Sequence, residues 1–411
     1  MKVKDLNIVI IGGGPAGLSM ARLLQLNDFK NVMVVERDIN RTIRVGGSSL
    51  DLHSDSGLIF IEKAKLMNEF LRVSRPEGES ITIADKNANI VLKKPHLKIA
   101  SKKPEIDRGV LRDLLVDSLV EGTIKWDHQF VSLNQLDNGK TEIVFKDGKT
   151  IVADLVIGAD GANSKIRPYV TDMKLKYSGI TLVEFEVENP KQLCPQVYEW
   201  VDAGLFYVLD DEKGFIVQLK GDGNLIIYLS CKREENWIKN SGLDFKNDLE
   251  SVKTFIKKEV LSDWNPIFHN VVDNATFFIP RPLFSIPLDP MIDWKSNKNI
   301  TLIGDAAHTI VPYAGKGINS GMMDAVELTE CLIEPSDMQL SERLNRYEEK
   351  MHTRMLEVAT DSMDAQEIVH NKDANTLLVD RFLGYYKYVK DILPYFIYSI
   401  NYITDLFGFS K

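Results

Sequence analysis

Near its N-terminus the chain carries the stretch Asn7-Ile8-Val9-Ile10-Ile11-Gly12-Gly13-Gly14-Pro15-Ala16-Gly17. The apolar run that opens it is typical of a strand buried on both faces of a parallel sheet. Gly12 permits a tight turn, Gly14 lets a phosphate approach the backbone, and Gly17 allows a helix to pack closely on the strand. The stretch therefore predicts a strand, a turn and a helix whose N-terminus offers free N–H groups and a partial positive charge.

A second apolar run, Val32–Val35, ends in Glu36, nineteen residues after Gly17. An acidic residue at this distance accepts hydrogen bonds from the ribose hydroxyls of a bound adenosine. Strand, turn, helix, strand and acid in this order predict a dinucleotide-binding unit, and the alternative is an accidental glycine-rich turn. The candidate binding residues of this unit are Gly12, Gly14, Pro15, Ala16, Gly17 and Glu36.

Two later segments repeat the pattern of a buried strand that ends in a carboxylate. Leu155–Ala159 leads into Asp160, and Ile300–Gly304 leads into Asp305. Ligands of parallel sheets bind at the carboxyl ends of the strands, so we expect both carboxylates at that edge. The run Gly315-Lys316-Gly317-Ile318-Asn319 then opens a final helix, whose positive end can stabilise a negative charge.

The order and spread of these segments indicate FAD, because a flavin dinucleotide is longer than one strand–turn–helix unit can hold. Asp305 is then expected to accept a ribitol hydroxyl, and the last helix to face the N1 and C2-carbonyl edge of the reduced ring. Taken alone, the segment at Asp160 is equally an ordinary turn at a strand end. The candidates in these segments are Asp160, Asp305, Gly315, Gly317, Ile318 and Asn319.

The composition is that of a cytosolic enzyme with a sizeable core. The chain has 411 residues, is 44% hydrophobic and carries a formal net charge of −9, which predicts about two domains and argues against nucleic acid as a partner. Its cysteines, Cys194, Cys231 and Cys331, and its histidines show no spacing typical of disulfides or metal ligands. We therefore expect a cytoplasmic protein without a metal site, and no apolar run reaches the eighteen or so residues of a membrane span.

Elsewhere the pattern alternates between helices and short strands. Gly57–Val73 predicts one helix, and Ser80–Ala84 with Asn89–Leu92 predicts a β-hairpin. From about residue 174 to residue 280, strands separated by tight turns predict an antiparallel sheet with one helix, Leu249–Val260, packed on it. No second Gly-x-Gly-x-x-Gly follows a strand, so we expect no separate nicotinamide domain.

These segments resemble those of the aromatic-hydroxylase group of flavin monooxygenases, the family typified by para-hydroxybenzoate hydroxylase. The resemblance covers the chain to about residue 370 and is strongest to the tetracycline-inactivating monooxygenases, through Arg44–His53, Arg108–Arg112 and Gly304–Ala325. It implies a mixed α/β fold, with an FAD-binding, Rossmann-like three-layer β/β/α domain, a substrate domain with a mixed sheet, and a C-terminal helix that bridges them. The expected boundaries are residues 1–73, 101–173 and 281–335 for the FAD-binding domain, 74–100 for a hairpin belonging to the substrate domain, 174–280 for the substrate domain itself, and 336–411 for the C-terminal helices.

The resemblance also implies roles for individual residues. Glu36 and Arg37 would hold the adenosine end of FAD, and Arg112 the ribitol and phosphate region. Asp51 and Arg44 would lie near the isoalloxazine ring.

The reaction implied by the resemblance is hydroxylation. NAD(P)H, with NADPH favoured, would reduce FAD, dioxygen would add to the reduced ring, and the resulting C4a-hydroperoxyflavin would transfer oxygen to a planar or polycyclic phenol or enol. The cofactor carries the difficult chemistry, while the protein orients the small-molecule substrate and excludes water. No catalytic side chain is assigned, and His308 is expected to be structural. Pro312 and Tyr313 are expected to line the substrate space, and the alternative is that they only shape the loop.

Several positions depart from the tetracycline-inactivating pattern. Lys316 stands where relatives usually carry Gln, so its charge is expected either near the flavin or in solvent. Gly204 and Ile226 stand in place of an Arg and a His, and Glu199 in place of a Gln. We therefore expect a more apolar cavity, with Glu199 and Tyr228 as polar candidates, which suits another polycyclic phenol at least as well as tetracycline.

The aromatic tail, with Phe382–Val389 and Tyr395–Ile400, is expected to form two short helices that pack on the protein itself. A dimer contact or a contact with a membrane surface are the alternatives. Other functions left open are an FAD-dependent reductase of isoprenoid chains, a flavin-dependent halogenase, and a non-catalytic flavoprotein that sequesters a ligand. A halogenase would need a tryptophan-rich signature, which Trp237, Trp264 and Trp294 do not form.

Overall fold

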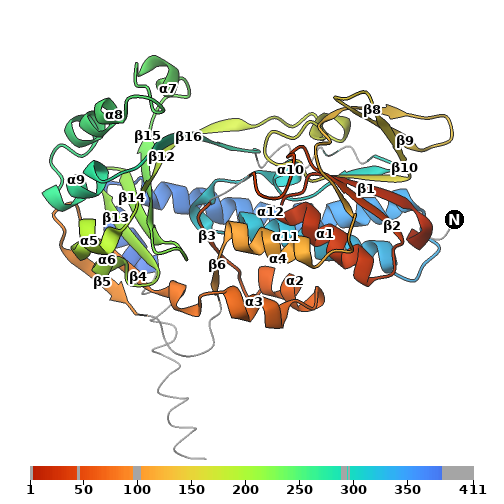
Figure 1. Ribbon diagram of the computed structural model, residues 1–411, viewed down its shortest axis with the longest axis horizontal. Helices are drawn as coiled ribbons and strands as arrows, with labels where there is room; N and C mark the ends of the chain where they lie inside the picture. The colour runs from red at the N-terminus through yellow and green to blue at the C-terminus, as the bar shows by residue number, and fades with distance from the viewer. Residues whose placement is uncertain (1–2, 44–46, 96–102, 288–293, 295–296, 382–411) are drawn as a thin grey trace, which may run out of the picture.

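The structure is a computed structural model that describes residues 3–43, 47–95, 103–287, 294 and 297–381. A parallel sheet with its helices lies at one end of the elongated molecule, a larger sheet lies at the other, and one long helix runs between them (Figure 1). Arg44 and the aromatic tail fall outside the described residues. Within the described ranges, no helix is long and apolar enough to cross a membrane.

A five-stranded sheet organises the first end of the molecule. Its order is β17-β11-β1-β2-β7, and every neighbouring pair is parallel. Buried side chains such as Val9 and Ile10 give the strands the apolar character expected of a sheet covered on both faces. The strand bounds are β1 Asn7–Ile11, β2 Asn31–Val35, β7 Ile124–Lys125, β11 Leu155–Gly158 and β17 Ile300–Leu302.

Helices cover one face of this sheet, and a smaller sheet in the order β10-β9-β8 covers the other (Figure 1). Phe145 of the smaller sheet, Leu18 of α1 and Leu328 of α11 belong to one continuous apolar core. The predicted three-layer β/β/α fold is therefore confirmed. The elements of these outer layers are β8 Phe130–Gln135, β9 Thr141–Phe145, β10 Thr150–Ala153, α1 Pro15–Leu26, α4 Arg108–Asp117 and α11 Gly317–Ile333.

A seven-stranded sheet forms the other end, in the order β16-β12-β15-β14-β13-β4-β5. Its strands between residues 176 and 285 pair antiparallel, as predicted. The predicted hairpin, β4 and β5, joins the sheet through a parallel pairing of β4 with β13, which makes the sheet mixed. The bounds are β4 Ile81–Ala84, β5 Ile90–Lys94, β12 Lys176–Val187, β13 Leu205–Asp210, β14 Lys213–Leu219, β15 Leu225–Lys232 and β16 Phe278–Ser285.

Two predicted helices differ in the structure. The single helix expected over residues 57–73 is two helices, α2 (Gly57–Lys63) and α3 (Met67–Val73), which are separated at Lys65 by a left-handed φ of +57°. The helix expected over residues 249–260 begins as α8 (Leu249–Phe255) and ends in the π-helical turn Ile256–Val260.

The remaining elements are short. They are the 3-10 turns η1 Val3–Asp5, η2 Pro76–Glu79, η3 Arg167–Tyr169 and η6 Pro312–Ala314, the strands β3 Ser49–Asp51 and β6 Glu105–Asp107, and the helices α5 Pro190–Leu193, α6 Pro195–Val201, α7 Trp237–Asn240, α9 Pro266–Asp273 and α10 Asp305–His308.

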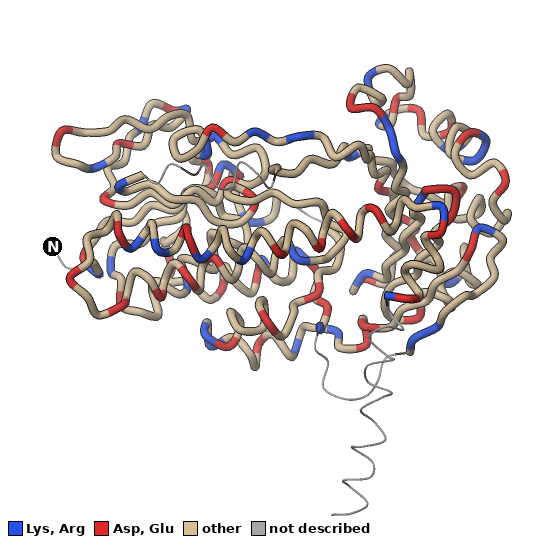
Figure 2. The backbone as a smooth tube through the Cα atoms, turned by 180° about the vertical axis from the view of Figure 1, so that it is seen from behind, with Lys and Arg blue, Asp and Glu red and all other residues tan. Residues whose placement is uncertain are grey.

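The long helix α12 (Leu340–Val369) connects the two ends. Tyr347 belongs to the core of the five-stranded sheet, whereas Val369 packs in a separate cluster against the seven-stranded sheet. A capping box formed by Gln339 and Glu342 begins the helix. Acidic and basic residues are interspersed along it, as they are over much of the described chain (Figure 2).

One buried arginine holds the turn between α11 and α12. Arg343 is 3% exposed, and its guanidinium donates hydrogen bonds to backbone carbonyls at the end of α11 and in the turn. Such carbonyls have no partner inside their own helix. They belong to Cys331, Leu332, Glu334, Ser336 and Met338.

We predict that Arg343→Leu lowers the free energy of unfolding by at least about 3 kcal/mol, because each buried carbonyl that loses its donor costs about 1–3 kcal/mol. Arg346→Leu is the matched control, since it removes only a partly exposed ion pair with Glu334 and should cost less than about 1 kcal/mol. Urea unfolding of both variants measures the difference. Equal effects would show that Arg343 does not hold the turn.

Candidate functional site

Close backbone contacts shape the glycine turn between β1 and α1. A Cβ on Gly12 would lie 2.2 Å from the carbonyl oxygen of Ala159, and Gly12 has a φ of +118°. A Cβ on Gly17 would lie 2.1 Å from the carbonyl oxygen of Gly12, so both positions require glycine. A Cβ on Gly14 would meet nothing within 4 Å, which leaves open space in front of the helix.

Pro15 and Ala16 form the first turn of α1, and no side chain caps this helix. Ala16 packs against Gly321 of α11 and against Gly304, because Cβ atoms added to Gly304 and Gly321 would lie 2.9 Å and 3.1 Å from its methyl group. The first N–H groups of α1 therefore have no side-chain partner and face the open space at Gly14.

Glu36, the residue after β2, is hydrogen-bonded to the same turn. Glu36 is buried, and its carboxylate accepts hydrogen bonds from the backbone N–H groups of Gly13 (2.6 Å) and Asp38 (3.0 Å). Its neighbour Arg37 is exposed. The contacts of Glu36 and Arg37 with an adenosine stay predictions, and the structure places both residues beside the turn where such contacts would form.

Arg112 of α4 reaches this turn from the other side. Its guanidinium donates to the carbonyl of Arg41 (2.8 Å) and, at 3.4 Å, to the carbonyl of Gly13. It also pairs with Asp38 at 3.6 Å and lies over the ring of Trp126, 5.3 Å from the centroid. These contacts fix a positive charge beside the open space at the N-terminus of α1.

The two predicted carboxylates at the sheet edge have different surroundings. The carboxylate of Asp160 closes its own turn by accepting hydrogen bonds from the Ser164 hydroxyl (2.5 Å) and the Lys165 N–H (2.7 Å). Asp305 begins α10 directly after β17, and it is exposed. Asp305 is therefore accessible to a ligand, whereas Asp160 is occupied by its own loop.

A buried arginine that no sequence pattern had singled out joins these two strand ends. Arg167 is 5% exposed, and its guanidinium donates to the carbonyls of Ala162 (2.7 Å), Asp305 (2.8 Å) and Ala306 (2.8 Å). Burial lowers the pKa of Arg167, against the opposing effect of the carboxylates of Asp160 and Asp305. Its place a few residues after Asp160 was the only available signal, and that spacing implies no chemistry by itself.

Asn319 uses its whole side-chain amide to hold neighbouring segments together. Nδ2 donates to the carbonyls of Asp51 (2.9 Å) and Gly315 (3.2 Å). Oδ1 accepts from the N–H groups of His53 (2.8 Å) and Gly57 (3.1 Å). The side chain predicted to bind the cofactor therefore has a positioning role, and a cofactor contact would have to come from the backbone of Asn319.

Helix α11 begins here without a side-chain cap. A Cβ on Gly317 would meet nothing within 4 Å, while one on Gly315, which has a φ of +66°, would lie 3.0 Å from the carboxylate of Asp51. Asp51 lies 2.8 Å from the Nε2 of His53. The first N–H groups of the helix, at Gly317 and Ile318, thus face open space beside Asp51.

Lys316 is the N-cap residue of α11, and a contact of its charge with the flavin stays a prediction. Its ammonium forms an ion pair with Asp361 of α12. The pair ties the beginning of α11 to the long helix, so the positive charge is balanced locally.

His308 lies in a buried network, in agreement with the structural role expected for it. Its Nε2 lies 2.6 Å from the carboxylate of Asp324, which also accepts from the Gly304 N–H (2.6 Å) and from Arg354 (2.5 Å). Burial would raise the pKa of Asp324, but His308 and Arg354 outweigh it and hold that pKa below its usual value.

The two faces of the seven-stranded sheet have different partners. Val208 and Ile227 belong to the core that packs against helices α6 to α9. Tyr207 and Tyr228 alternate with these residues along β13 and β15 and so lie on the opposite face. On that face Tyr313 of η6 packs in the same cluster as Tyr207.

Of the predicted substrate residues, Tyr228 and Tyr313 lie on this second face, and Pro312 is exposed at the start of η6. Glu199 does not join them. It is exposed on α6, whose Val197 packs on the first face of the sheet. A substrate between the sheet and η6 would be out of its reach, so the predicted role of Glu199 is wrong for this space.

Gly204 and Ile226, which stand where an Arg and a His were expected, provide no charged group. A Cβ on Gly204 would lie 2.1 Å from the carbonyl oxygen of Ser80, so no larger residue fits there. Ile226 is 3% exposed and contributes only apolar surface.

A buried carboxyl group lies at the junction of the two ends of the molecule. Glu105 of β6 is 2% exposed, accepts a hydrogen bond from Gln218 (3.0 Å) and lies 3.6 Å from Arg75. Burial raises the pKa of Glu105 to about 8, although Gln218 and Arg75 act in the opposite direction. Its sequence neighbours form no recognisable motif, which is why it was not predicted.

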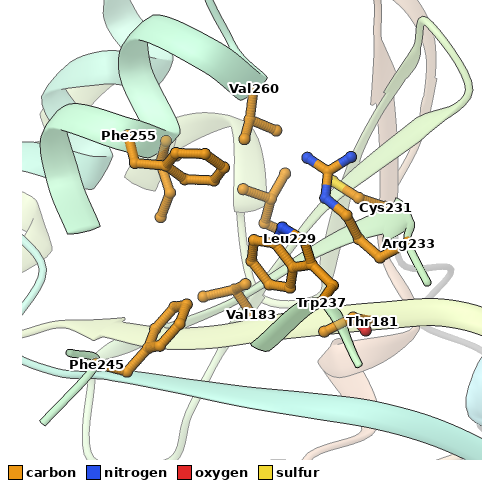
Figure 3. A pocket seen from close by; sticks show the side chains of 10 residues that line it. Thr181, Val183, Leu229, Cys231, Arg233, Trp237, Phe245, Phe255 and Val260 are labelled. Atoms are coloured by element: carbon orange, nitrogen blue, oxygen red, sulfur yellow. The ribbon is translucent and has the colours of Figure 1, made fainter. Parts of the chain in front are cut away.

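A small cavity lies on the first face of the seven-stranded sheet, beneath α8 (Figure 3). Its lining is mainly apolar and includes Val183, Leu229 and Trp237. It has room for no more than about one water molecule. An organic substrate therefore does not fit there.

The described residues fit FAD. Two uncapped helix N-termini face open space at Gly14 and Gly317, and the exposed carboxylate of Asp305 lies at the same edge of the sheet. Backbone N–H groups suit the pyrophosphate and the anionic end of a reduced flavin, while a carboxylate suits a ribitol hydroxyl. The sequence matches the family described as FAD binding domain over residues 5–362. The chain belongs to this family. It is an FAD-dependent monooxygenase of the aromatic-hydroxylase type.

Known proteins of this kind are similar along most of their length. Monooxygenase asqM of Emericella nidulans is 27% identical to this enzyme over 378 residues, which cover 80% of this chain and 84% of that protein. The 6-hydroxynicotinate 3-monooxygenase of Pseudomonas fluorescens is 27% identical over 338 residues, 80% of this chain and 82% of its own. The crystal structure of the tetracycline destructase Tet(55) is 20% identical with a TM-score of 0.71, covers 93% of this chain and 96% of its own, and shows a shared fold.

We predict that Asp305→Ala weakens FAD binding by roughly 5- to 150-fold, because a buried ribitol hydroxyl that loses its partner costs about 1–3 kcal/mol. The matched control is Asp337→Ala, which removes an exposed aspartate from the turn between α11 and α12. Titration of the apoprotein with FAD, followed by flavin fluorescence, measures both affinities. An unchanged affinity in Asp305→Ala would exclude the role given to this carboxylate.

We also predict a pH effect from Glu105, whose pKa is raised from 4.5 to about 8 in the folded enzyme. Between these values the folded state keeps a proton that the unfolded state has lost, so Glu105 makes stability fall as the pH rises through this window. Glu105→Gln cannot ionise and should gain stability relative to the wild type from about pH 5 to about pH 8. Urea unfolding across this range tests it, with the exposed Glu121→Gln as the control. Parallel pH profiles of wild type and Glu105→Gln would show that Glu105 ionises normally.

Proposed function

We propose that this monooxygenase uses NAD(P)H, with NADPH preferred over NADH, and dioxygen to hydroxylate a planar or polycyclic phenol or enol. The observation that carries this proposal is the sheet face formed by Tyr207, Tyr228 and Tyr313. Tyrosine rings offer flat apolar surface with a single polar atom each, which suits a planar ring that bears few polar groups. The similarity to 6-hydroxynicotinate 3-monooxygenase, whose named substrate is a hydroxylated aromatic ring, supports the same substrate class.

The tyrosine face lies close to the loop that borders the flavin end of the site. Burial raises the pKa of Tyr207, and the carboxylates of Asp51 and Glu105 act on it in the same direction. Burial raises the pKa of Tyr228 to about 12, while a hydrogen bond with Ser48 acts against this shift. Both phenols therefore stay neutral at physiological pH and can donate or accept hydrogen bonds.

When bound, FAD supplies the oxygen-transfer chemistry, and the chain binds and orients the reactants. The N-terminus of α1 at Gly14, together with Arg112, would hold the pyrophosphate. Asp305 would accept a ribitol hydroxyl, and the N-terminus of α11 would stabilise negative charge on the flavin. Arg167 and Asn319 act through these segments, because they fix the strand ends and the Asp51 loop in place.

The substrate face favours a less polar molecule than tetracycline. Gly204 has no room for a longer side chain, and Ile226 offers no hydrogen bond. Charge-assisted hydrogen bonds are worth about 1.5–3 kcal/mol each. A ligand that depended on an Arg and a His at these positions would therefore bind more weakly here by a factor on the order of a hundred or more.

We predict that a polycyclic phenol stimulates NADPH oxidation and gains one oxygen atom, while tetracycline is oxidised slowly or not at all. A substrate screen that follows NADPH oxidation together with product mass tests this, with a reaction without substrate as the control. Efficient tetracycline oxidation with low-micromolar affinity, typical of good enzyme substrates, would contradict the substrate preference. Reduction of a double bond under anaerobic conditions, or halide-dependent turnover, would contradict hydroxylation itself.

A further inference from the structure

Three polar side chains form a hydrogen-bonded network at one end of the tyrosine face. The Oη of Tyr313 and the Oγ of Ser230 are 2.5 Å apart, and the same Oγ lies 2.6 Å from the Nε2 of His370. The three residues come from η6, from β15 and from the residue that ends α12. Ser230 is 0% exposed and His370 is 3% exposed, whereas Tyr313 keeps part of its surface exposed. Tyr313 is therefore the member of this hydrogen-bonded network that a ligand can reach.

The direction of these hydrogen bonds follows from a backbone carbonyl. The Nδ1 of His370 lies 2.8 Å from the carbonyl oxygen of Gln366, and because a carbonyl only accepts, Nδ1 carries the proton. Burial lowers the pKa of His370, so near neutral pH the ring is uncharged and Nε2 is an acceptor. Ser230 therefore donates its hydroxyl proton to His370, and Tyr313 donates its own to Ser230.

The charged groups around this hydrogen-bonded network act on His370 in opposite directions. Lys232 lowers the pKa of His370 and Glu212 raises it, and these two residues pair with each other at 2.6 Å. Burial raises the pKa of Tyr313, and the ionisable groups that act on it, Cys231 and Tyr177, act in the same direction. No strong local charge among these groups opposes the direction set by the backbone carbonyl.

We infer that Tyr313 is an acceptor-only group toward the substrate, and that Ser230 and His370 are positioning residues that keep it so. This inference rests on the proposed function, because it concerns the substrate of the same site. The only proton of the Tyr313 hydroxyl is committed to Ser230, so its oxygen offers lone pairs alone to a ligand. The site therefore selects a substrate that places a hydroxyl or an N–H, rather than an ether or a carbonyl, against Tyr313.

Protonation of His370 reverses the direction of these hydrogen bonds. Nε2 then donates to Ser230, Ser230 donates to Tyr313, and Tyr313 donates outward. The added proton comes from solvent at low pH.

The test compares 2-naphthol with 2-methoxynaphthalene, in which a methyl group replaces the hydrogen of the hydroxyl. Binding to the FAD-loaded enzyme is measured without NADPH, by the change in flavin fluorescence. At about pH 8 the wild type should bind the naphthol about fivefold more tightly than the ether, the effect of one net hydrogen bond. The preference should disappear or reverse at a lower pH at which His370 takes up a proton, which lies below the usual range of a histidine because burial lowers its pKa.

Variants distinguish a role of these three residues in hydroxyl selection from a purely structural role. Tyr313→Phe should show no preference at either pH, and Ser230→Ala should bind both probes with a preference that no longer depends on pH. His269→Gln, on α9 at the other face of the sheet, is the control and should retain both effects. FAD content and thermal unfolding verify that each variant is folded. His370→Gln adds a second break in the chain, and Ser230→Ala decides the question if His370→Gln does not fold.

Equal affinity of the wild type for both probes at both pH values, failure of 2-naphthol to bind, or a pH-dependent preference that persists in Ser230→Ala would each overturn the inference. NADPH oxidation and oxygen incorporation with 2-naphthol are recorded separately. Turnover without the hydroxyl preference would overturn the inference and leave the proposed function standing. A hydroxyl preference without incorporation of oxygen into any phenol would overturn the proposed function and leave the inference standing.

Discussion

The buried carboxylate of Asp324 is the constraint on which the rest of the structure depends. A charge with 0% exposure is costly unless it is paired and fully hydrogen-bonded. Gly304, His308 and Arg354 supply these hydrogen bonds from the end of β17, from α10 and from α12. Since Asp324 itself belongs to α11, one carboxylate fixes four elements around the loop that carries Asp305. If one of these partners moved away, the buried carboxylate of Asp324 would lose a hydrogen bond in apolar surroundings.

The same constraint positions the substrate side. Arg354 anchors α12 at Asp324, and the helix continues for sixteen residues to His370, a distance of about 24 Å at 1.5 Å per residue. Lys316 and Asp361 make a second attachment along this span, next to the beginning of α11. A rigid helix held at two points carries His370 to the seven-stranded sheet at a set position. The helix therefore couples the geometry of the cofactor loop to the hydrogen-bonded end of the tyrosine face.

Features that depend on local spacing could be predicted from the sequence. The parallel sheet, the glycine turn and the carboxylates after β11 and β17 each arise within a few residues, where apolar runs and glycine spacing specify the backbone. Contacts between distant segments could not be predicted from the sequence. Arg167 holds residues nearly 140 positions away, and Ser230 meets His370 across 140, so no local pattern marks them. Lys65 breaks a predicted helix through a left-handed φ that lysine rarely adopts, and Glu199 was misplaced because the packing of α6, not its spacing in sequence, decides which face of the sheet it approaches.

Two kinds of structure make the two halves of the site, and this difference explains why the type of reaction is easier to establish than the substrate. The cofactor half is built largely from backbone: helix N-termini, and glycines whose Cβ atoms would collide with neighbouring carbonyls. Such features survive extensive change in sequence, which accounts for a shared fold at 20% identity. The substrate half is built from side chains on the tyrosine face of the seven-stranded sheet, where Ile226 and Gly204 supply no charge. Polar recognition on this face must then come from hydroxyl groups, whose direction is set by residues behind them. A neutral hydroxyl can donate or accept, so its selectivity is decided by the hydrogen bond that its proton has already made.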